Sequence, residues 1–128
     1  MINGCGIDIV EIKRIRKMID KWGIRFLKKI YTHKEIEACQ SKKLNQYQSL
    51  AGIFAAKEAF VKSIGTGFRN IQWKDIEITH NKLGKPMINI SEELQKKFQR
   101  GHNVYFHLSI AHTQEIAIAE VIAEGLNK

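Results

Sequence analysis

Two carboxylates and one lysine are the residues of this chain whose types and spacing best suit chemistry. Asp8 stands between Ile7 and Ile9 in a short apolar segment, and Glu58 and Lys62 lie four residues apart in a long helical pattern. An acid inside a strand is costly to bury unless it is paired or bound to a cation. Mg²⁺ prefers one or two carboxylates together with waters and phosphate oxygens, and a nearby lysine can neutralise the remaining phosphate charge. The pattern therefore indicates a magnesium site for a pyrophosphate group.

Each of these residues also has an alternative interpretation that needs no ligand. Asp8 alone fits a strand-end acid that faces water or caps the helix expected to open at Glu11. Glu58 and Lys62 alone fit a surface ion pair worth about 0.3–0.5 kcal/mol. Such a pair leaves unexplained the alanines at 51 and 55 on the same helix face, where small side chains let a backbone or ligand come near. Taken alone, these residues leave both interpretations open.

Other candidate groups give weaker signals. Ser109 and His112 could form a nucleophile pair, but no Gly-x-Ser-x-Gly turn surrounds the serine and no acid is placed as a third member. The histidines lack zinc-ligand spacing. Gly65 and Gly67 follow their helix instead of preceding one, so they indicate a helix end and only weakly a phosphate loop. A hydrolase triad and a zinc site are therefore disfavoured.

The basic residues indicate a partner of opposite charge. The chain has 21 Lys and Arg against 13 Asp and Glu, for a formal net charge of +8. Such an excess favours nucleic acid, a phosphate-rich ligand or an acidic protein, although it also occurs in proteins that merely stay soluble. Four residues run at helical spacing if the helix persists past Gly23: Arg14, Met18, Lys21 and Arg25. A basic stripe with a methionine suits an acidic amphipathic helix, and a solvated face is the common alternative.

The elements that must position these groups follow from the hydrophobic periodicity. We expect a strand over 2–10, whose glycines at 4 and 6 allow close approach to another backbone. A helix follows from Glu11, which Gly23 breaks or kinks, and a short apolar face covers 26–30. We then expect a helix from a Thr32 capping box to 39 and a long helix over 46–64. The remaining elements are strands over 73–79 and 87–90, a helix over 91–101, and strands over 103–111 and 116–122. The order βαααββαββ predicts an α+β fold with an antiparallel sheet packed against helices.

Length and composition limit the class of protein. A chain of 128 residues that is 44% hydrophobic suits a single domain over 1–128. No apolar run approaches the ~20 residues of a membrane-spanning helix, and the N-terminus has no secretory signal pattern. Cys5 and Cys39 make no disulfide framework and indicate reduced thiols, with a single disulfide as the alternative. We therefore expect a soluble, cytoplasmic protein.

Four sequence blocks together resemble a known family. They are Gly6-Ile-Asp8-Ile-Val-Glu-Ile, Phe54-Ala-Ala-Lys-Glu58-Ala-Phe-Val-Lys62 followed by Gly65-Thr-Gly67, Gly84-Lys-Pro86, and Leu108-Ser-Ile-Ala-His112-Thr113. In this order, over nearly the whole chain, they are similar to the holo-acyl-carrier-protein synthases, the short bacterial form of the 4′-phosphopantetheinyl transferase family. The resemblance implies the fold of that family. It also implies transfer of the phosphopantetheine arm of coenzyme A to a serine of apo-acyl carrier protein, for fatty acid biosynthesis, with release of adenosine 3′,5′-bisphosphate.

The resemblance also implies roles for individual residues. Asp8 and Glu58 match the Mg²⁺ ligands of the family, and these two and Lys62 are the expected catalytic residues. The positions that match coenzyme A contacts are Lys62, Gly65, Gly84, Lys85, Pro86, Ser109, His112 and Thr113. In the family the nucleotide end is lined by a neighbouring subunit, which implies a homotrimer with sites at its interfaces. The stripe of Arg14, Met18, Lys21 and Arg25 resembles the surface that docks the acidic helix of the carrier protein.

Two departures from the family pattern and two rival functions remain. Ile53 stands where many relatives have an arginine, and Ala111 stands where they have a serine or threonine, so contacts attributed to those side chains are in doubt. A basic nucleic-acid-binding module is one rival, but the aromatic residues fall in core patterns and no binding motif occurs. A non-catalytic scaffold that binds carrier proteins is the other, and the intact acids and Lys62 argue against it. We expect neither a nucleic acid nor a membrane as partner.

Overall fold

The computed structural model describes residues 1–98 and 103–126 of the chain. Its elements in order are β1 (Ile2–Glu11), α1 (Ile12–Trp22), α2 (Ile24–Ile30), α3 (His33–Gln40), the short 3₁₀ helix η1 (Lys43–Asn45), α4 (Gln46–Ile64), the 3₁₀ helix η2 (Trp73–Asp75), β2 (Ile76–His80), β3 (Pro86–Ile90), α5 (Glu92–Phe98), β4 (Asn103–His112) and β5 (Ile116–Leu126). The expected α+β class is confirmed. The expected order counted three helices after the first strand, whereas the structure has four. Gly23 separates α1 from α2, because its φ of 56° ends the first helix.

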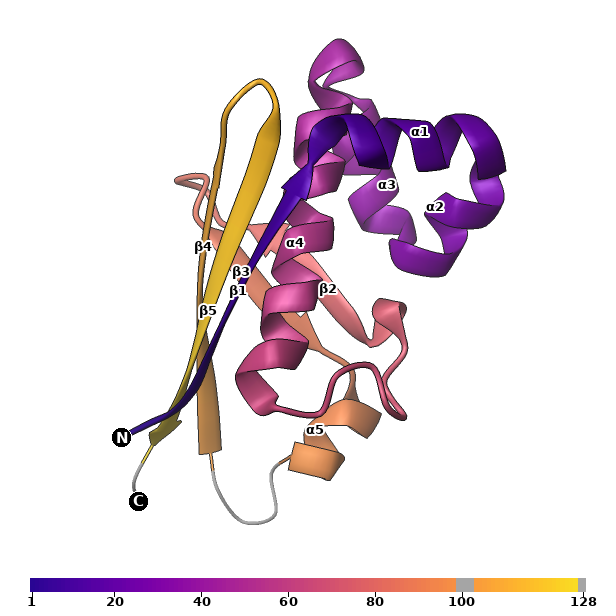
Figure 1. Cartoon of the computed structure of the whole chain (residues 1–128). Coiled ribbons are helices and arrows are strands. Elements are labelled where there is room, and N and C mark those ends of the chain that lie inside the picture. Colours follow the sequence, from indigo (N-terminus) through magenta and orange to yellow (C-terminus); the bar gives the residue numbers. More distant parts are fainter. Residues whose placement is uncertain (99–102, 127–128) are drawn as a thin grey trace.

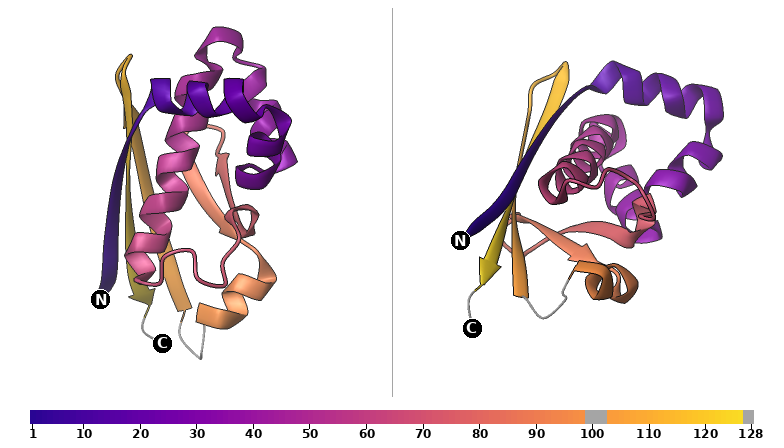
Figure 2. Two further views of the ribbon diagram at one scale, coloured as in Figure 1. Left: turned by 45° about the vertical axis from the view of Figure 1, so that its right-hand side comes forward. Right: turned by 60° about the horizontal axis from the view of Figure 1, so that its bottom comes forward.

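The strands form two antiparallel sheets instead of one. A three-stranded sheet has the order β1-β5-β4, and β2 pairs only with β3. Helix α4 lies along one face of the three-stranded sheet (Figure 1). Seen nearly along its axis, α4 has this sheet on one side and α1 to α3 on the other (Figure 2). The helix is therefore central to the fold and carries side chains toward both sides.

Two glycines allow α4 to approach β1 closely. A Cβ added at Gly6 would lie 2.0 Å from the carbonyl oxygen of Ala59, and one added at Gly4 would lie 2.1 Å from that of Ser63. These distances confirm the close approach expected from the sequence. Because side chains alternate along a strand, Asp8 follows Gly4 and Gly6 on the face that meets α4.

The helix ends agree with their sequence signals. The Thr32 hydroxyl accepts from the N–H of Glu35, and the Glu35 carboxylate accepts from the N–H of Thr32, so the capping box is present. Gly65 ends α4 in the left-handed conformation with a φ of 76°. No helix in the described ranges is long and apolar enough to cross a membrane.

Three expected boundaries differ or cannot be compared. The strand expected from residue 73 begins at Ile76, because residues 73–75 form η2, in which the Asp75 carboxylate accepts from the N–H of Gln72 at 2.9 Å. The last strand continues beyond the expected residue 122 to Leu126. The helix end expected at Gly101 lies outside the described residues.

Candidate active site

Asp8, Glu58 and Lys62 come together where β1 crosses α4. The Lys62 ammonium lies 3.2 Å from Oδ1 of Asp8 and donates to the carbonyl oxygen of Ile7 at 3.0 Å. The Asp8 side chain is 17% exposed and that of Lys62 is 52% exposed. The alternative in which Asp8 caps the following helix is wrong, since α1 begins after Glu11 with no side-chain cap. The aspartate therefore faces the lysine and α4.

Glu58 is half-buried on the same side of α4. Burial raises the pKa of its carboxyl group, and the negative charge of Asp8 raises it further, while Lys62 and Arg14 act in the opposite direction. A second carboxylate within electrostatic reach disfavours ionisation of the first. The two acids and one half-exposed lysine thus form a cluster in which a bound cation would relieve carboxylate repulsion.

The donor set of this cluster fits Mg²⁺ better than zinc. Two carboxylates from separate elements match the one or two that Mg²⁺ takes from a protein, with water and phosphate oxygens completing its coordination. In residues 1–98 and 103–126, no group of three or more His, Cys, Asp or Glu side chains could hold a metal. A divalent ion bound at this cluster would have Asp8 and Glu58 as its protein ligands.

Part of the expected nucleotide-binding set lines a separate cavity. Gly84, Pro86 and His112 border a cavity of about 220 Å³ that α3 and α4 close from the other side. Ile53, which is 4% exposed, contributes an apolar wall to this cavity. Lys42 supplies a cation at this cavity, and its ammonium donates to the Ser49 hydroxyl at 3.1 Å.

The other three expected nucleotide contacts do not line this cavity. Ser109 is exposed on the outer face of the three-stranded sheet, opposite the side that packs on α4. The Thr113 hydroxyl accepts from the N–H groups of Glu115 and Ile116, each at 3.1 Å, and so holds the turn between β4 and β5. Lys85 is exposed, and its N–H donates to Oδ1 of Asn81 at 2.9 Å.

One chain therefore presents two separate groups of candidate residues. None of Asp8, Glu58 and Lys62 borders the cavity of Gly84 and His112. Asp8 belongs to β1 and His112 to β4, the two outer strands of the sheet. The two groups are consequently separated by the width of the sheet and by α4.

The expected docking stripe is divided between two helices. Arg14, Met18 and Lys21 are exposed on α1, whereas Arg25 lies on α2, because the first helix ends at Trp22. Arg14 is near enough to lower the pKa of Glu58. The basic face of α1 therefore adjoins the carboxylate cluster.

One feature beside the docking stripe was not expected from the sequence. Trp22 is 47% exposed, and the Lys21 ammonium lies 5.1 Å from its ring centroid.

A buried ion pair was also not expected. On the inner side of α4, which faces away from the three-stranded sheet, Lys57 and Glu35 form an ion pair at 2.7 Å with neither side chain exposed. Burial lowers the pKa of Lys57, and the Glu35 carboxylate counteracts this shift. A lysine flanked by alanines and phenylalanines in the sequence was the signal that could have identified this pair.

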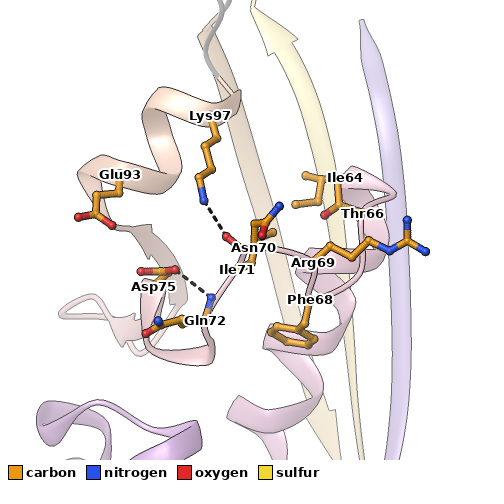
Figure 3. Close-up of a pocket in the computed structure, with 10 residues that line it drawn as sticks. All are labelled: Ile64, Thr66, Phe68, Arg69, Asn70, Ile71, Gln72, Asp75, Glu93 and Lys97. Carbon is orange, nitrogen blue, oxygen red and sulfur yellow. Dashed lines mark hydrogen bonds between the residues drawn. The ribbon is translucent and has the colours of Figure 1, made fainter.

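The large cavity of Figure 3 contains none of the expected site residues. It measures about 920 Å³ and lies between the loop after α4 and α5. Its charged groups are already engaged in part: Asp75 accepts from the N–H of Gln72 at 2.9 Å, and Lys97 donates to the carbonyl oxygen of Asn70 at 2.7 Å. Size alone therefore does not mark the candidate site.

Comparison with known proteins identifies the family of the chain. Residues 4–119 match the family model described as the 4'-phosphopantetheinyl transferase superfamily. A holo-[acyl-carrier-protein] synthase of Halothermothrix orenii is 50% identical over 124 residues, which cover 97% of this chain and 98% of the relative.

Two solved structures extend the similarity to three dimensions. Holo-[acyl-carrier-protein] synthase from Neisseria meningitidis aligns with a TM-score of 0.87 at 36% identity, over 97% of this chain and 99% of that one. The Bacillus anthracis synthase in complex with CoA (3',5'-ADP) aligns with a TM-score of 0.78 at 40% identity, over 96% of each chain. Since its sequence and its fold both match this family, the chain belongs to the 4'-phosphopantetheinyl transferase superfamily.

Proposed function

We propose that this transferase moves the 4′-phosphopantetheine arm of coenzyme A to a serine of apo-acyl carrier protein, with Mg²⁺ held by Asp8 and Glu58. The observation that carries the proposal is the pair of carboxylates beside Lys62, on elements whose backbones are in contact. The ligand of the Bacillus anthracis relative, CoA (3',5'-ADP), supports the choice of substrate. In the reaction the serine hydroxyl loses its proton as its oxygen forms a bond to phosphorus, the pyrophosphate P–O bond breaks, and its electron pair stays on the adenosine 3′,5′-bisphosphate that leaves.

The residues of the chain suit the demands of phosphoryl transfer, which are mainly positioning and charge stabilisation. Bound Mg²⁺ would supply Lewis-acid stabilisation of the phosphate oxygens. Lys62 is half-exposed on a flexible stem, so its ammonium can turn from Asp8 toward an arriving phosphate. There it would stabilise the charge that develops on the leaving group. Asp8 is held by β1 and Glu58 by α4, so neither depends on a loop for its position.

The basic face of α1 is the proposed docking surface for the acidic carrier protein. It comprises Arg14, Met18 and Lys21, and Arg25 extends it onto α2. Because Arg14 also influences Glu58, a carrier bound here would bring its serine near the carboxylate cluster. This adjacency favours a protein acceptor over a nucleic acid, for which no base-reading motif is present.

We further propose a homotrimer in which two chains complete one site. Asp8 and Glu58 lie apart from the cavity of Gly84 and His112 within one chain, so a neighbouring chain would supply the second group. The outer face of the sheet exposes Ile7 and Ile9 at 55% and 60%, an apolar surface that an interface would cover. Sedimentation of Ile9→Glu against the wild-type chain tests this: the variant should dissociate and lose transfer, and a fully active wild-type monomer would contradict it.

A mass spectrum of apo-acyl carrier protein after incubation with this chain, coenzyme A and Mg²⁺ tests the reaction itself. We expect a mass gain of one phosphopantetheine, abolished by a chelator and restored by added Mg²⁺. A folded, oligomeric sample that modifies none of several apo-carriers would contradict the proposal and favour a carrier-binding scaffold. We expect the reaction to occur in the cytoplasm.

A further inference from the structure

The inner side of α4 carries an ion pair that lies apart from the carboxylate cluster. Lys57 is wholly buried, and its ammonium donates to three acceptors: Oε1 of Glu35 at 2.7 Å, the carbonyl oxygen of Ile30 at 2.7 Å and the carbonyl oxygen of Trp73 at 3.2 Å. A lysine ammonium has three N–H donors. All three are therefore used inside the protein, and none is left for a ligand.

Glu35 is equally saturated by its surroundings. Its Oε1 also accepts from the N–H of Thr32 at 2.8 Å, and its Oε2 accepts from the N–H of Ile78 at 2.7 Å. The ion pair thus joins the end of α2, the start of α3, the turn η2 and strand β2 to a single residue of α4. It holds α4 to these four elements on the side away from the three-stranded sheet.

Lys57 directly precedes Glu58 in the sequence. Successive residues of an α-helix are turned by about 100°, so the rotation that directs Lys57 to its three acceptors also directs Glu58 toward β1. On the β1 side, the backbone of Gly6 leaves no room for a Cβ against Ala59. Rotation or sliding of α4 would break the bonds of Lys57 on one side and cause clashes on the other.

Building on the proposed function, we infer that Lys57, held by Glu35, is a positioning residue that fixes the rotation and height of α4 and so sets Glu58 opposite Asp8 for the metal. Stability alone does not require this pair, because well-packed apolar residues in place of a buried ion pair are often as stabilising or more so. Directional hydrogen bonds to three separate elements do select one placement of the helix. The Lys57–Glu35 pair therefore fixes the position of the metal-binding side of α4 relative to β1.

The test compares the wild-type chain with three variants. Lys57→Met removes the ammonium, and the paired variant Glu35→Gln/Lys57→Met removes it without leaving a buried charge unpaired. Leu94→Ala is the matched control, because it opens space in the core on α5, away from the carboxylate cluster. Urea unfolding establishes which variants are folded. Electron paramagnetic resonance then measures Mn²⁺ binding in the presence of coenzyme A, and transfer assays give kcat and KM.

We expect each folded Lys57 variant to bind Mn²⁺ about tenfold or more weakly and to lose about 10–100-fold in kcat. Leu94→Ala should lose stability but keep wild-type Mn²⁺ affinity and kcat per folded molecule. A folded paired variant with wild-type Mn²⁺ affinity and kcat overturns the positioning role while leaving the proposed function intact. A wild-type chain that binds no Mn²⁺ with coenzyme A overturns the metal assignment and this inference together. If the paired variant does not fold, the Mn²⁺ affinity and kcat of folded Lys57→Met decide whether the positioning role holds.

Discussion

Two lysines of α4, five residues apart, each pair with a carboxylate of another element, and the two pairs differ in burial and in the partners of the lysine. Lys57 and Glu35 lie 2.7 Å apart with neither side chain exposed, whereas Lys62 and Asp8 lie 3.2 Å apart with 52% and 17% exposure. All three ammonium donors of Lys57 have protein acceptors. Lys62 instead shares its neighbourhood with two carboxylates, Asp8 and Glu58, whose charges oppose each other.

The difference distinguishes a structural pair from a candidate catalytic one. A saturated, buried pair has no capacity for a ligand and contributes to one defined packing arrangement. A half-exposed pair with an extra carboxylate has more carboxylates than lysines and a cation that solvent and ligands can reach, which suit a metal ion and a phosphate group. The same residue types therefore have different roles in the two pairs. The burial of the side chains and the number of hydrogen-bond partners of the lysine distinguish the structural pair from the candidate catalytic pair.

Removal of Lys57 should have the largest effect on stability. Lys57→Met leaves the Glu35 carboxylate buried without its cation, which typically costs about 3–5 kcal/mol. Lys62→Met is the matched control, and its half-exposed pair predicts a loss of no more than about 1 kcal/mol. Urea unfolding of both variants measures the difference, and equal losses would remove the distinction between the two pairs.

Neutralising Asp8 or Glu58 in the carboxylate cluster should abolish transfer without unfolding the chain. For Asp8→Asn and Glu58→Gln we expect kcat/KM to fall at least about 100-fold, since loss of a metal's outer-shell partners already costs about 10–100-fold. Stability should be retained, because the charge of Asp8 disfavours that of Glu58 in the folded state. Transfer assays and urea unfolding on the same samples decide, and near-normal turnover at limiting Mg²⁺ would refute the metal assignment.

Reversal of a charge on α1 should have a smaller and more selective effect. Arg14→Glu should raise KM for the carrier protein about tenfold, because charges at an interface rim steer association, and should leave KM for coenzyme A nearly unchanged. Lys97→Glu, on α5 and outside both candidate groups, is a matched surface control. Steady-state kinetics with each substrate varied in turn measures both constants. Equal changes for the two substrates would place the docking surface elsewhere.

The buried thiol of Cys39, on the inner side of α4, should react slowly with alkylating reagents in the folded chain. Cys5 and Cys39 are both free, so the disulfide alternative is wrong, and only Cys39 is buried. Burial raises the pKa of Cys39 to about 11, so its reactive thiolate is scarce at pH 8.5. This raised pKa contributes to the free energy of unfolding at pH values below about 9, the pKa of the thiol in the unfolded chain. The contribution is lost as the pH rises toward 11, the pKa in the folded chain. In a Cys5→Ser chain, iodoacetamide at pH 8.5 should modify Cys39 only after urea is added, and rapid native alkylation would show that the cavity of Gly84 and His112, which Cys39 borders, admits the reagent.

The sequence was sufficient to predict features that depend on local spacing. Asp8, Glu58 and Lys62 were singled out by residue type, and the glycines at 4 and 6 predicted the close approach that brings β1 to α4. The extent of α4 and its end at Gly65 also followed from local signals.

Features that depend on distant pairing could not be predicted in this way. Glu35 and Lys57 are 22 residues apart and meet only in the folded chain. The order β1-β5-β4, which separates Asp8 from His112, likewise arises from long-range strand pairing that leaves no trace in local periodicity.

The most direct test of the metal assignment is the affinity for coenzyme A, measured by calorimetry with and without Mg²⁺. If Asp8 and Glu58 hold a metal that also binds the pyrophosphate, the metal and coenzyme A must strengthen each other's binding reciprocally. We predict that Mg²⁺ tightens coenzyme A binding about tenfold in the wild-type chain, within the usual range of such coupling, and has no effect in Glu58→Gln. Equal tightening in both proteins would show that the metal is held elsewhere.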